Sequence, residues 1–133
     1  MIRIEHLGIA VSNMNESITL FENLLNKKCY KTEGVASEGV RTAFFQVGDS
    51  KIELLEATNP DSPIAKYLAK QGQGIHHIAF EVENIEEELK RLRALGFVLI
   101  HEIPKRGADN KRIAFLHPKS TNGVLVELCQ EIK

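Results

Sequence analysis

The sequence is short of cysteine, of long apolar runs and of net charge, and each shortage excludes a class of protein. The net charge of the 133 residues is −1, so nothing in the overall charge favours binding to nucleic acid or to an anionic membrane surface. No stretch is apolar over the roughly 20 residues that a membrane-spanning helix requires. The two cysteines, Cys29 and Cys129, lack CxxC spacing, so we expect reduced thiols in a cytoplasmic protein.

The start of the chain also lacks the pattern of a secretory signal. Arg3 and Glu5 interrupt any apolar run there, so we expect no signal peptide. What the sequence does have is the composition of an ordinary soluble globular domain, with 43% apolar and 26% charged residues. Its length is sufficient for one domain with its own apolar core.

An internal repeat is the most informative feature of the sequence. Residues 4–13 (IEHLGIAVSN) match residues 75–84 (IHHIAFEVEN), so that His6 aligns with His77 and Asn13 with Asn84. Both segments have the pattern of a buried strand that contains a polar histidine. Two copies of one strand, each with a histidine at the same point, indicate a site shared between two halves of the chain.

The elements predicted after each copy also repeat. Asn13 and Asn84 each begin a helix, with a glutamate three residues later as in a capping box. In order, the predicted elements are 2–11, 14–25, 28–33, 41–47 and 51–56, a short helix at 64–71, then 75–82, 85–95, 97–101, 112–116 and 123–129. We therefore predict an α+β fold in which two tandem βαβββ modules form a curved sheet around a metal-binding cleft.

We predict one domain over residues 1–133, with a first module at about 1–57, a linker helix at about 58–72 and a second module at about 73–133. Each module helix has one apolar stripe that should face the sheet. The stripes are Met14, Ile18, Phe21 and Leu25 in the first helix, and Ile85, Leu89, Leu92 and Leu95 in the second.

The last strand of each half contains a glutamate inside an apolar run. Glu53 and Glu127 occupy equivalent positions when the halves are aligned. A buried carboxylate is costly unless it is paired or binds a metal. Together with His6 and His77, these glutamates provide four ligands that suit a six-coordinate divalent ion such as cobalt, manganese, nickel or zinc. Two positions would remain for water or substrate, as a catalytic metal needs.

The other histidines are weaker candidates. A single histidine in a strand is more often a core or surface residue than a ligand, and it is the repeat that favours His6 and His77. His76 should point away from His77, because successive strand side chains face opposite sides. His101 and His117 lie near predicted strand ends without an equivalent partner, so we interpret both as structural or surface residues.

Six segments carry a resemblance to a known family. They are residues 6–11 (HLGIAV), 51–56 (KIELLE), 61–65 (DSPIA), 74–80 (GIHHIAF), 111–120 (KRIAFLHPKS) and 123–127 (GVLVE). With them the chain resembles the vicinal-oxygen-chelate superfamily of glyoxalase, bleomycin resistance and dioxygenase proteins. More narrowly it resembles the methylmalonyl-CoA epimerase family, to which the HPKS and GVLVE block is specific. The resemblance implies paired βαβββ modules that hold a divalent metal, here expected to be cobalt, through one histidine and one glutamate or glutamine each.

The resemblance also implies an activity. A metal-dependent epimerase of this family interconverts (R)- and (S)-methylmalonyl-CoA, by moving the proton on the carbon α to the thioester through a metal-stabilised enolate. Inversion needs two acid–base groups, and the resemblance assigns one of them to Glu127. It further implies a role in propionate metabolism and assembly as a homodimer.

The chain departs from the family pattern at the second acid–base group. Some family members have a glutamate where this chain has Thr42, three residues after Gly39. Threonine is a poor base, Glu38 precedes the glycine, and Lys51 shares a predicted strand face with Glu53. We predict Lys51 as the second group, because a neighbouring dication would lower its pKa. Glu38, Thr42 and a water relay are the alternatives.

Basic residues near Gly107 are candidates for contact with the phosphates of coenzyme A, although a solvated loop is an equally good interpretation. They are Lys105, Arg106, Lys111, Arg112 and Lys119.

Other functions fit the same scaffold. A glyoxalase-type lyase or isomerase would keep the four ligands and act on a glutathione hemithioacetal. An extradiol dioxygenase would use two histidines and one carboxylate on iron, so a fourth ligand counts against it. A non-enzymatic module that binds small molecules has no use for buried glutamates, which counts against that alternative.

Overall fold

The computed structural model describes residues 1–133 and contains three α-helices and eight β-strands. The chain divides into two compact units. We name each unit after the repeated histidine that it contains. The His6 unit is His6–His76, and the His77 unit is Met1–Glu5 together with His77–Lys133.

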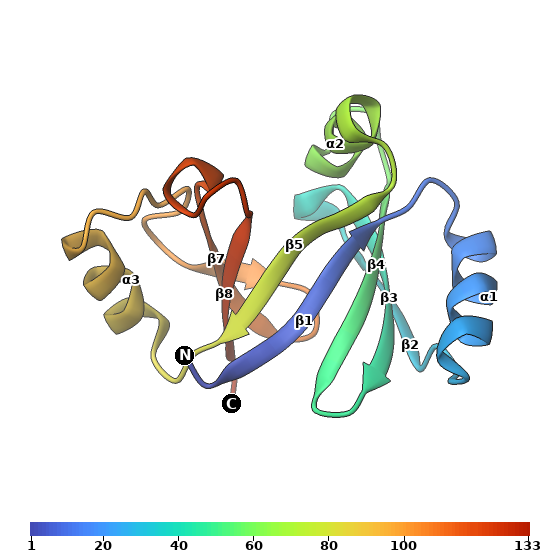
Figure 1. Ribbon diagram of the computed structural model, residues 1–133, viewed down its shortest axis with the longest axis horizontal. Helices are drawn as coiled ribbons and strands as arrows, with labels where there is room; N and C mark the ends of the chain where they lie inside the picture. The colour runs from blue at the N-terminus through green and yellow to red at the C-terminus, as the bar shows by residue number, and fades with distance from the viewer. The chain divides into compact units, whose positions relative to one another are not determined.

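The His6 unit contains most of β1 (Arg3–Ala10), α1 (Met14–Leu25), β2 (Lys31–Val35), the 3-10 turn η1 (Ala36–Glu38), β3 (Val40–Val47), β4 (Ser50–Ala57), α2 (Pro63–Gln71) and the start of β5 (Gly74–Glu81). Strand β4 lies between β1, to which it is parallel, and β3, to which it is antiparallel. Strand β3 pairs antiparallel with β2. Helix α1 packs on β3 and β4, and α2 packs on β4 (Figure 1).

Helix α1 forms where the sequence predicts it. The Asn13 side chain accepts a hydrogen bond from the Glu16 amide at 3.0 Å, which satisfies one of the free N–H groups of the first turn. Met14 is buried, and the rest of the predicted stripe packs with it against Phe45 and Leu54. The predicted apolar face of α1 is confirmed.

Helix α2 covers other residues of the same strands. It begins at Ser62, whose hydroxyl accepts a hydrogen bond from the Ala65 amide at 3.1 Å. Ile64 packs against Leu55 of β4 and Ala10 of β1. Since successive side chains of a strand face opposite sides, the face of β4 that carries Leu55 is not the face that α1 covers.

The His77 unit contains the start of β1, most of β5, α3 (Ile85–Ala94), β6 (Lys105–Gly107), β7 (Lys111–Leu116), the 3-10 turn η2 (Pro118–Ser120) and β8 (Val126–Glu131). Strand β8 lies between β5, to which it is parallel, and β7, to which it is antiparallel. Strand β6 forms a short hairpin with β7. Helix α3 packs on β8 (Figure 1).

The stripe predicted for α3 is confirmed at three of its four positions. Ile85, Leu89 and Leu92 are buried in a core with Leu128 of β8. Leu95 is 66% exposed, so its predicted burial is wrong. The helix ends at Ala94 and Leu95 is its C-terminal cap, so this side chain no longer follows the helical stripe.

The repeat in the sequence is also a repeat in structure. Gly8 of β1 is the register partner of Glu53, and Ala79, which aligns with Gly8, is the register partner of Glu127. The first helical amide of each module donates to a side chain of the module's last strand at 2.7 Å, from Met14 to Glu56 and from Ile85 to Gln130. The hydrogen-bonded strand order is β2-β3-β4-β1 in the first module and β5-β8-β7-β6 in the second. The α+β class and the two βαβββ modules are confirmed.

One predicted strand is wrong. Residues 97–101 form no regular strand, and only Leu99 makes an isolated bridge, to Leu116 of β7. The second strand of this module, the first after its helix, is instead β6, which the sequence analysis placed in a loop. The main chain leaves β7 after Ile100 and returns at Lys105, so the pairing is split into two short pieces.

Two further expectations concern the chain as a whole. None of its helices combines the length and the apolar character needed to cross a membrane. Cys29 lies in the His6 unit and Cys129 in the His77 unit, and neither forms a disulfide.

Candidate metal centre

The first candidate pair lies wholly within the His6 unit. The Nδ1 atom of His6 on β1 is 3.0 Å from the Oε2 atom of Glu53 on β4. Each residue is only 4% exposed. The two strands are parallel neighbours, and the side chains lie close because Glu53 is in register with Gly8, two residues beyond His6. The absence of a side chain at Gly8 leaves room for the carboxylate beside β1.

The strands around this pair supply one aromatic and one cationic neighbour. Phe44 of β3 is the direct register partner of Glu53 and is fully buried. Lys51 is the register partner of His6 and lies two residues before Glu53 on β4. Alternation along the strand therefore places Lys51 on the same face as Glu53, as the sequence predicts. Its side chain is half-buried.

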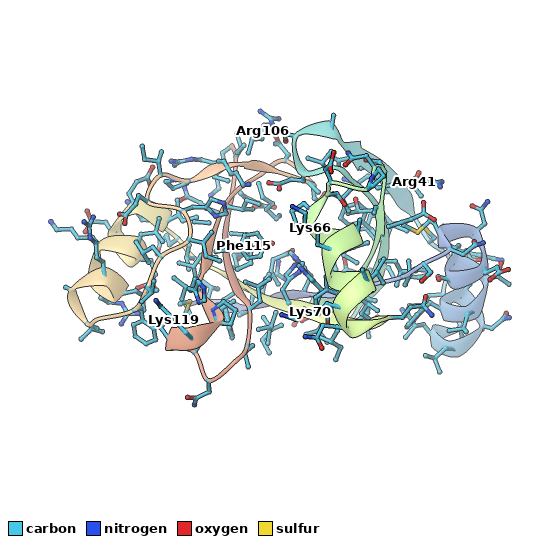
Figure 2. All side chains as sticks on the ribbon, turned by 90° about the horizontal axis from the view of Figure 1, so that it is seen from above. Arg41, Lys66, Lys70, Arg106, Phe115 and Lys119 are labelled. Carbon is cyan, nitrogen blue, oxygen red and sulfur yellow. The ribbon has the colours of Figure 1, made fainter.

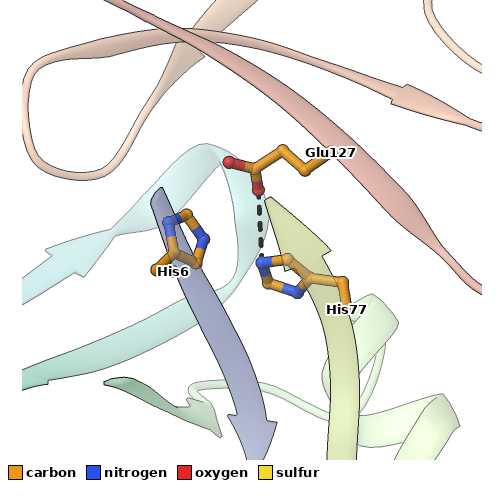
Figure 3. A group of neighbouring side chains, drawn as sticks. All are labelled: His6, His77 and Glu127. Carbon is orange, nitrogen blue, oxygen red and sulfur yellow. Dashed lines mark ion pairs between the residues drawn. The ribbon is translucent and has the colours of Figure 1, made fainter. Parts of the chain in front are cut away.

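The second candidate pair lies wholly within the His77 unit (Figure 3). The Nε2 atom of His77 on β5 is 3.3 Å from the Oε1 atom of Glu127 on β8. Each residue is 5% exposed. As in the first pair, the strands are parallel neighbours, and the glutamate is in register with a small residue, Ala79, two positions beyond the histidine.

Phe115 of β7 closes one side of the second pair. It is the register partner of Glu127, just as Phe44 is the register partner of Glu53. The Phe115 ring meets the His77 ring edge to face, with centroids 5.5 Å apart and an interplanar angle of 84°. This is the arrangement that aromatic quadrupoles favour.

The chemistry of the four side chains suits a divalent metal. An unpaired carboxylate at this depth would be strongly disfavoured, and each glutamate has a histidine nitrogen beside it. Imidazole nitrogen and carboxylate oxygen together are ligands that cobalt, manganese, nickel and zinc accept. All four side chains belong to buried groups that could hold a metal ion. The sequence analysis named these four residues, and the structure brings them together as two buried pairs.

The remaining histidines take other roles. The ring of His76 stacks edge to face on Tyr67 of α2, with centroids 4.8 Å apart. His117 caps η2, because its Nδ1 atom accepts a hydrogen bond from the Lys119 amide at 3.1 Å. His101 accepts a hydrogen bond from the amide of Phe115.

The contact between His101 and Phe115 was missed in the sequence analysis. A signal for it was present: the offset that relates His6 to His77 also relates Phe44 to Phe115 and Tyr30 to His101. Both aromatic neighbours are in contact, at 6.1 Å between the ring centroids of Tyr30 and Phe44 and 5.8 Å for His101 and Phe115.

The three side chains considered for the second acid–base group lie in different settings. Thr42 is buried on β3, and its hydroxyl donates a hydrogen bond to the Glu33 carbonyl at 3.1 Å. Glu38 lies in the turn η1, not on a strand next to the first pair. Lys51 lies on β4 as the register partner of His6.

Most of the basic cluster near Gly107 has partners within the chain. Four of its five residues lie on the β6–β7 hairpin, not in an open loop, and Lys119 lies in η2. Lys111 is buried with its Nζ atom 3.7 Å from Glu131, Arg112 bonds to Glu86, and Arg106 bonds to Asn110.

Other lysines are exposed and have no acidic partner. They include Lys119 in η2 and two residues of α2 that the sequence analysis did not consider, Lys66 and Lys70 (Figure 2). A spacing of four residues along α2 puts the last two on one face of the helix.

The model of the Glyoxalase/Bleomycin resistance protein/Dioxygenase superfamily matches residues 5–115. The chain belongs to this superfamily.

Within the superfamily, the similar proteins include epimerases. The chain is 44% identical to the uncharacterized protein YqjC of Bacillus subtilis, over 98% of this chain and 93% of that protein. It is 41% identical to the mitochondrial methylmalonyl-CoA epimerase of Dictyostelium discoideum, over 95% of this chain and 76% of that protein. A structure of a Streptomyces coelicolor methylmalonyl-CoA epimerase variant with 2-nitronate-propionyl-CoA superposes with a TM-score of 0.92 at 35% identity, covering 98% of this chain and 95% of that one.

Proposed function

We propose that this protein is a metal-dependent epimerase that interconverts (R)- and (S)-methylmalonyl-CoA. The observation that carries the proposal is the pair of buried histidine–glutamate contacts at equivalent positions of the two modules. The similarity to proteins named methylmalonyl-CoA epimerase supports the choice of substrate. No observation favours a glyoxalase reaction or a binding module over this one.

His6, Glu53, His77 and Glu127 would hold one divalent ion, for which cobalt is our first choice and manganese, nickel and zinc are alternatives. When bound, the ion would act as a Lewis acid for the negative charge that develops on the thioester oxygen. The short His–Glu distances and the depth of burial support this ligand set, because both carboxylates need a positive partner. Glycine and alanine in register with the two glutamates leave space next to each.

Inversion at the α-carbon requires one group that removes a proton and another that returns it on the opposite face. We assign Glu127 as the acid–base group on one face of the α-carbon. Glu127 is buried and its register partners Phe115 and Ala79 are apolar, and electrostatic interactions are stronger in such a setting than in water. We assign Lys51 as the acid–base group on the opposite face of the α-carbon. Lys51 is the register partner of His6 and lies on the same side of strand β4 as Glu53. Glu38, Thr42 and a water relay are the alternatives for this second group.

The proposed function also includes contacts with coenzyme A, an oligomeric state and a cellular location. The phosphates of coenzyme A would contact exposed lysines, with Lys119, Lys66 and Lys70 ahead of the hairpin residues that already have acidic or polar partners. We also propose a homodimer. The protein would act in the cytoplasm, in propionate metabolism.

The test is hydrogen exchange at the α-carbon. Purified protein loaded with cobalt is incubated with (S)-methylmalonyl-CoA in deuterated water, and incorporation of deuterium is followed by mass spectrometry together with appearance of the (R) form. Exchange and inversion should both occur, and both should stop when the metal is removed. A fully metallated sample that exchanges no α-hydrogen would overturn the proposal, and turnover of a glutathione hemithioacetal in its place would favour the glyoxalase alternative.

A further inference from the structure

The outer edge of β7 is interrupted where it passes the second pair. Val98 and Ile100 bond to this edge, through His117 N to Val98 O at 2.7 Å and Ile100 N to Phe115 O at 2.8 Å. Regular pairing resumes only at β6, whose Lys105 is in register with Ile113. Between these points the main chain leaves β7, so one amide on this edge lacks a main-chain partner.

That amide belongs to Phe115. Its carbonyl accepts from Ile100, and in an antiparallel strand the N–H and C=O of one residue point to the same neighbour. The N–H therefore points to the interrupted edge and not to β8. The Nδ1 atom of His101 accepts it at 3.1 Å. An imidazole nitrogen takes the place of a main-chain carbonyl at the point where the ladder breaks.

Phe115 connects this edge to the candidate metal ligands. Its main chain is fixed on one side by His101 and Ile100 and on the other by register with Glu127. Its ring lies against His101, with centroids 5.8 Å apart, and edge to face against His77 at 5.5 Å. Both members of the second pair therefore touch or lie opposite Phe115.

The first module has no equivalent of the hydrogen bond between the His101 side chain and the Phe115 amide. At the equivalent place, β2 continues along β3, and Lys31 is in register with Phe44. Tyr30, which aligns with His101, donates its own amide to the Phe44 carbonyl at 3.1 Å. No side chain has to replace a main-chain acceptor there.

We infer that His101 is a positioning residue for the metal centre: by accepting the Phe115 amide it holds the Phe115 ring against His77 and so orients that ligand. Residues that orient a metal-ligating histidine change metal affinity by about 10–100-fold when they are removed. The inference rests on the proposed metal-binding function and adds a residue that does not itself touch the ion.

The test compares His101→Ala with His101→Asn and with His117→Ala. Asparagine keeps an acceptor at the position of Nδ1, so it should restore what alanine removes. His117 is the matched control, because its Nδ1 also accepts an amide at 3.1 Å but caps η2 away from Phe115. For Co²⁺ binding followed by the visible spectrum of the metal, His101→Ala should raise the Kd by about 10-fold or more. His101→Asn and His117→Ala should stay close to the wild type.

A second measurement does not depend on metal binding. In metal-free protein, the C–H protons of the His77 imidazole, assigned with a His77→Gln variant, experience the ring current of Phe115. His101→Ala should shift these resonances and His101→Asn should restore them, whereas His117→Ala should leave them unchanged. If the wild type binds no cobalt, the proposed metal centre fails and the resonances still test the positioning role. If His101→Ala folds and leaves the His77 resonances unmoved, or lowers affinity no more than His101→Asn, the inference is overturned.

Discussion

The two modules build the same histidine–glutamate pair with different atoms and different surroundings. In the His6 unit the imidazole faces its glutamate through Nδ1, at 3.0 Å, and in the His77 unit through Nε2, at 3.3 Å. In both, the glutamate lies opposite a phenylalanine. In the first pair a lysine is the strand neighbour of the histidine, and in the second an aromatic ring lies against the histidine.

This difference suggests that the two modules contribute equally to metal binding but differently to proton transfer. Register and burial are common to both halves, and these are what ligand placement needs. The neighbours differ, and proton transfer depends on them, because a base beside a cationic side chain and a base beside an aromatic ring have different charges around them. We therefore expect matched substitutions in the two halves to affect metal binding alike and proton exchange unequally.

The largest expected effect separates the two glutamates. Glu127→Gln should lower α-hydrogen exchange by about 10²–10⁴-fold, the range found when a general acid–base group is removed. Glu53→Gln keeps an oxygen ligand and removes no proposed acid–base group, so it should cause a smaller loss. Deuterium incorporation into methylmalonyl-CoA measures both, and circular dichroism verifies that each variant folds. Equal losses in the two variants would show that the glutamates are interchangeable.

The next effect concerns the lysine that only the first pair has. Lys51→Ala should slow exchange by about 10²-fold while leaving cobalt affinity nearly unchanged, because Lys51 is assigned to proton transfer and not to the metal. Glu38→Ala is the matched control and should exchange at nearly the wild-type rate. If neither variant slows the reaction, the second proton path runs through water or another residue.

A smaller effect tests whether the two modules fold with the same local determinants. Asn13 and Asn84 cap α1 and α3 through hydrogen bonds of 3.0 and 3.1 Å. Substitution of either by alanine should lower the free energy of unfolding by about 1 kcal/mol, as for other N-caps. Urea denaturation of the two variants gives the comparison. If only one of the two variants loses stability, the two helices do not depend on their N-caps in the same way.

The smallest effect concerns the charged surface of α3. The hydrogen bond from Arg91 holds the pKa of Glu88 below its ordinary value of 4.5. A lowered carboxyl pKa adds stability above the unfolded value, and that stability is lost as the pH falls through the folded value. Arg91→Gln should therefore cost about 0.3–0.5 kcal/mol near neutral pH and nothing in strong acid.

Urea denaturation at several pH values follows this difference. Lys90→Gln is the control, since Lys90 is exposed on the same helix and has no acidic partner. A cost of Arg91→Gln that persists unchanged below the folded pKa would contradict an electrostatic origin.

Much of the fold and of the candidate centre was predictable because both depend on a repeated pattern. The matching segments around His6 and His77 determined which strands are central, and period-two alternation determined which histidine of the adjacent pair faces Glu127. Alternation of this kind can be recognised from the residues of each strand alone. The registers that place Gly8 and Ala79 beside the glutamates are contacts between strands, and the sequence analysis did not predict them.

What the sequence did not predict depends on contacts between segments. The strand predicted at 97–101 failed because its pairing with β7 breaks after Ile100, which no property of those residues alone reveals. The role of His101 was missed for the same reason, since it arises from an amide of Phe115 that the break leaves exposed. Leu95 has the sequence spacing of the apolar stripe of α3, but the helix ends one residue before it, so its side chain does not lie on that stripe.

The measurement that tests the central claim most directly is the cobalt stoichiometry of the purified chain, by equilibrium dialysis with metal analysis. One ion held jointly by His6, Glu53, His77 and Glu127 predicts one cobalt per chain, and a weaker single site when either histidine is replaced by alanine. Two cobalt ions per chain, each lost independently with its own histidine, would contradict a shared centre.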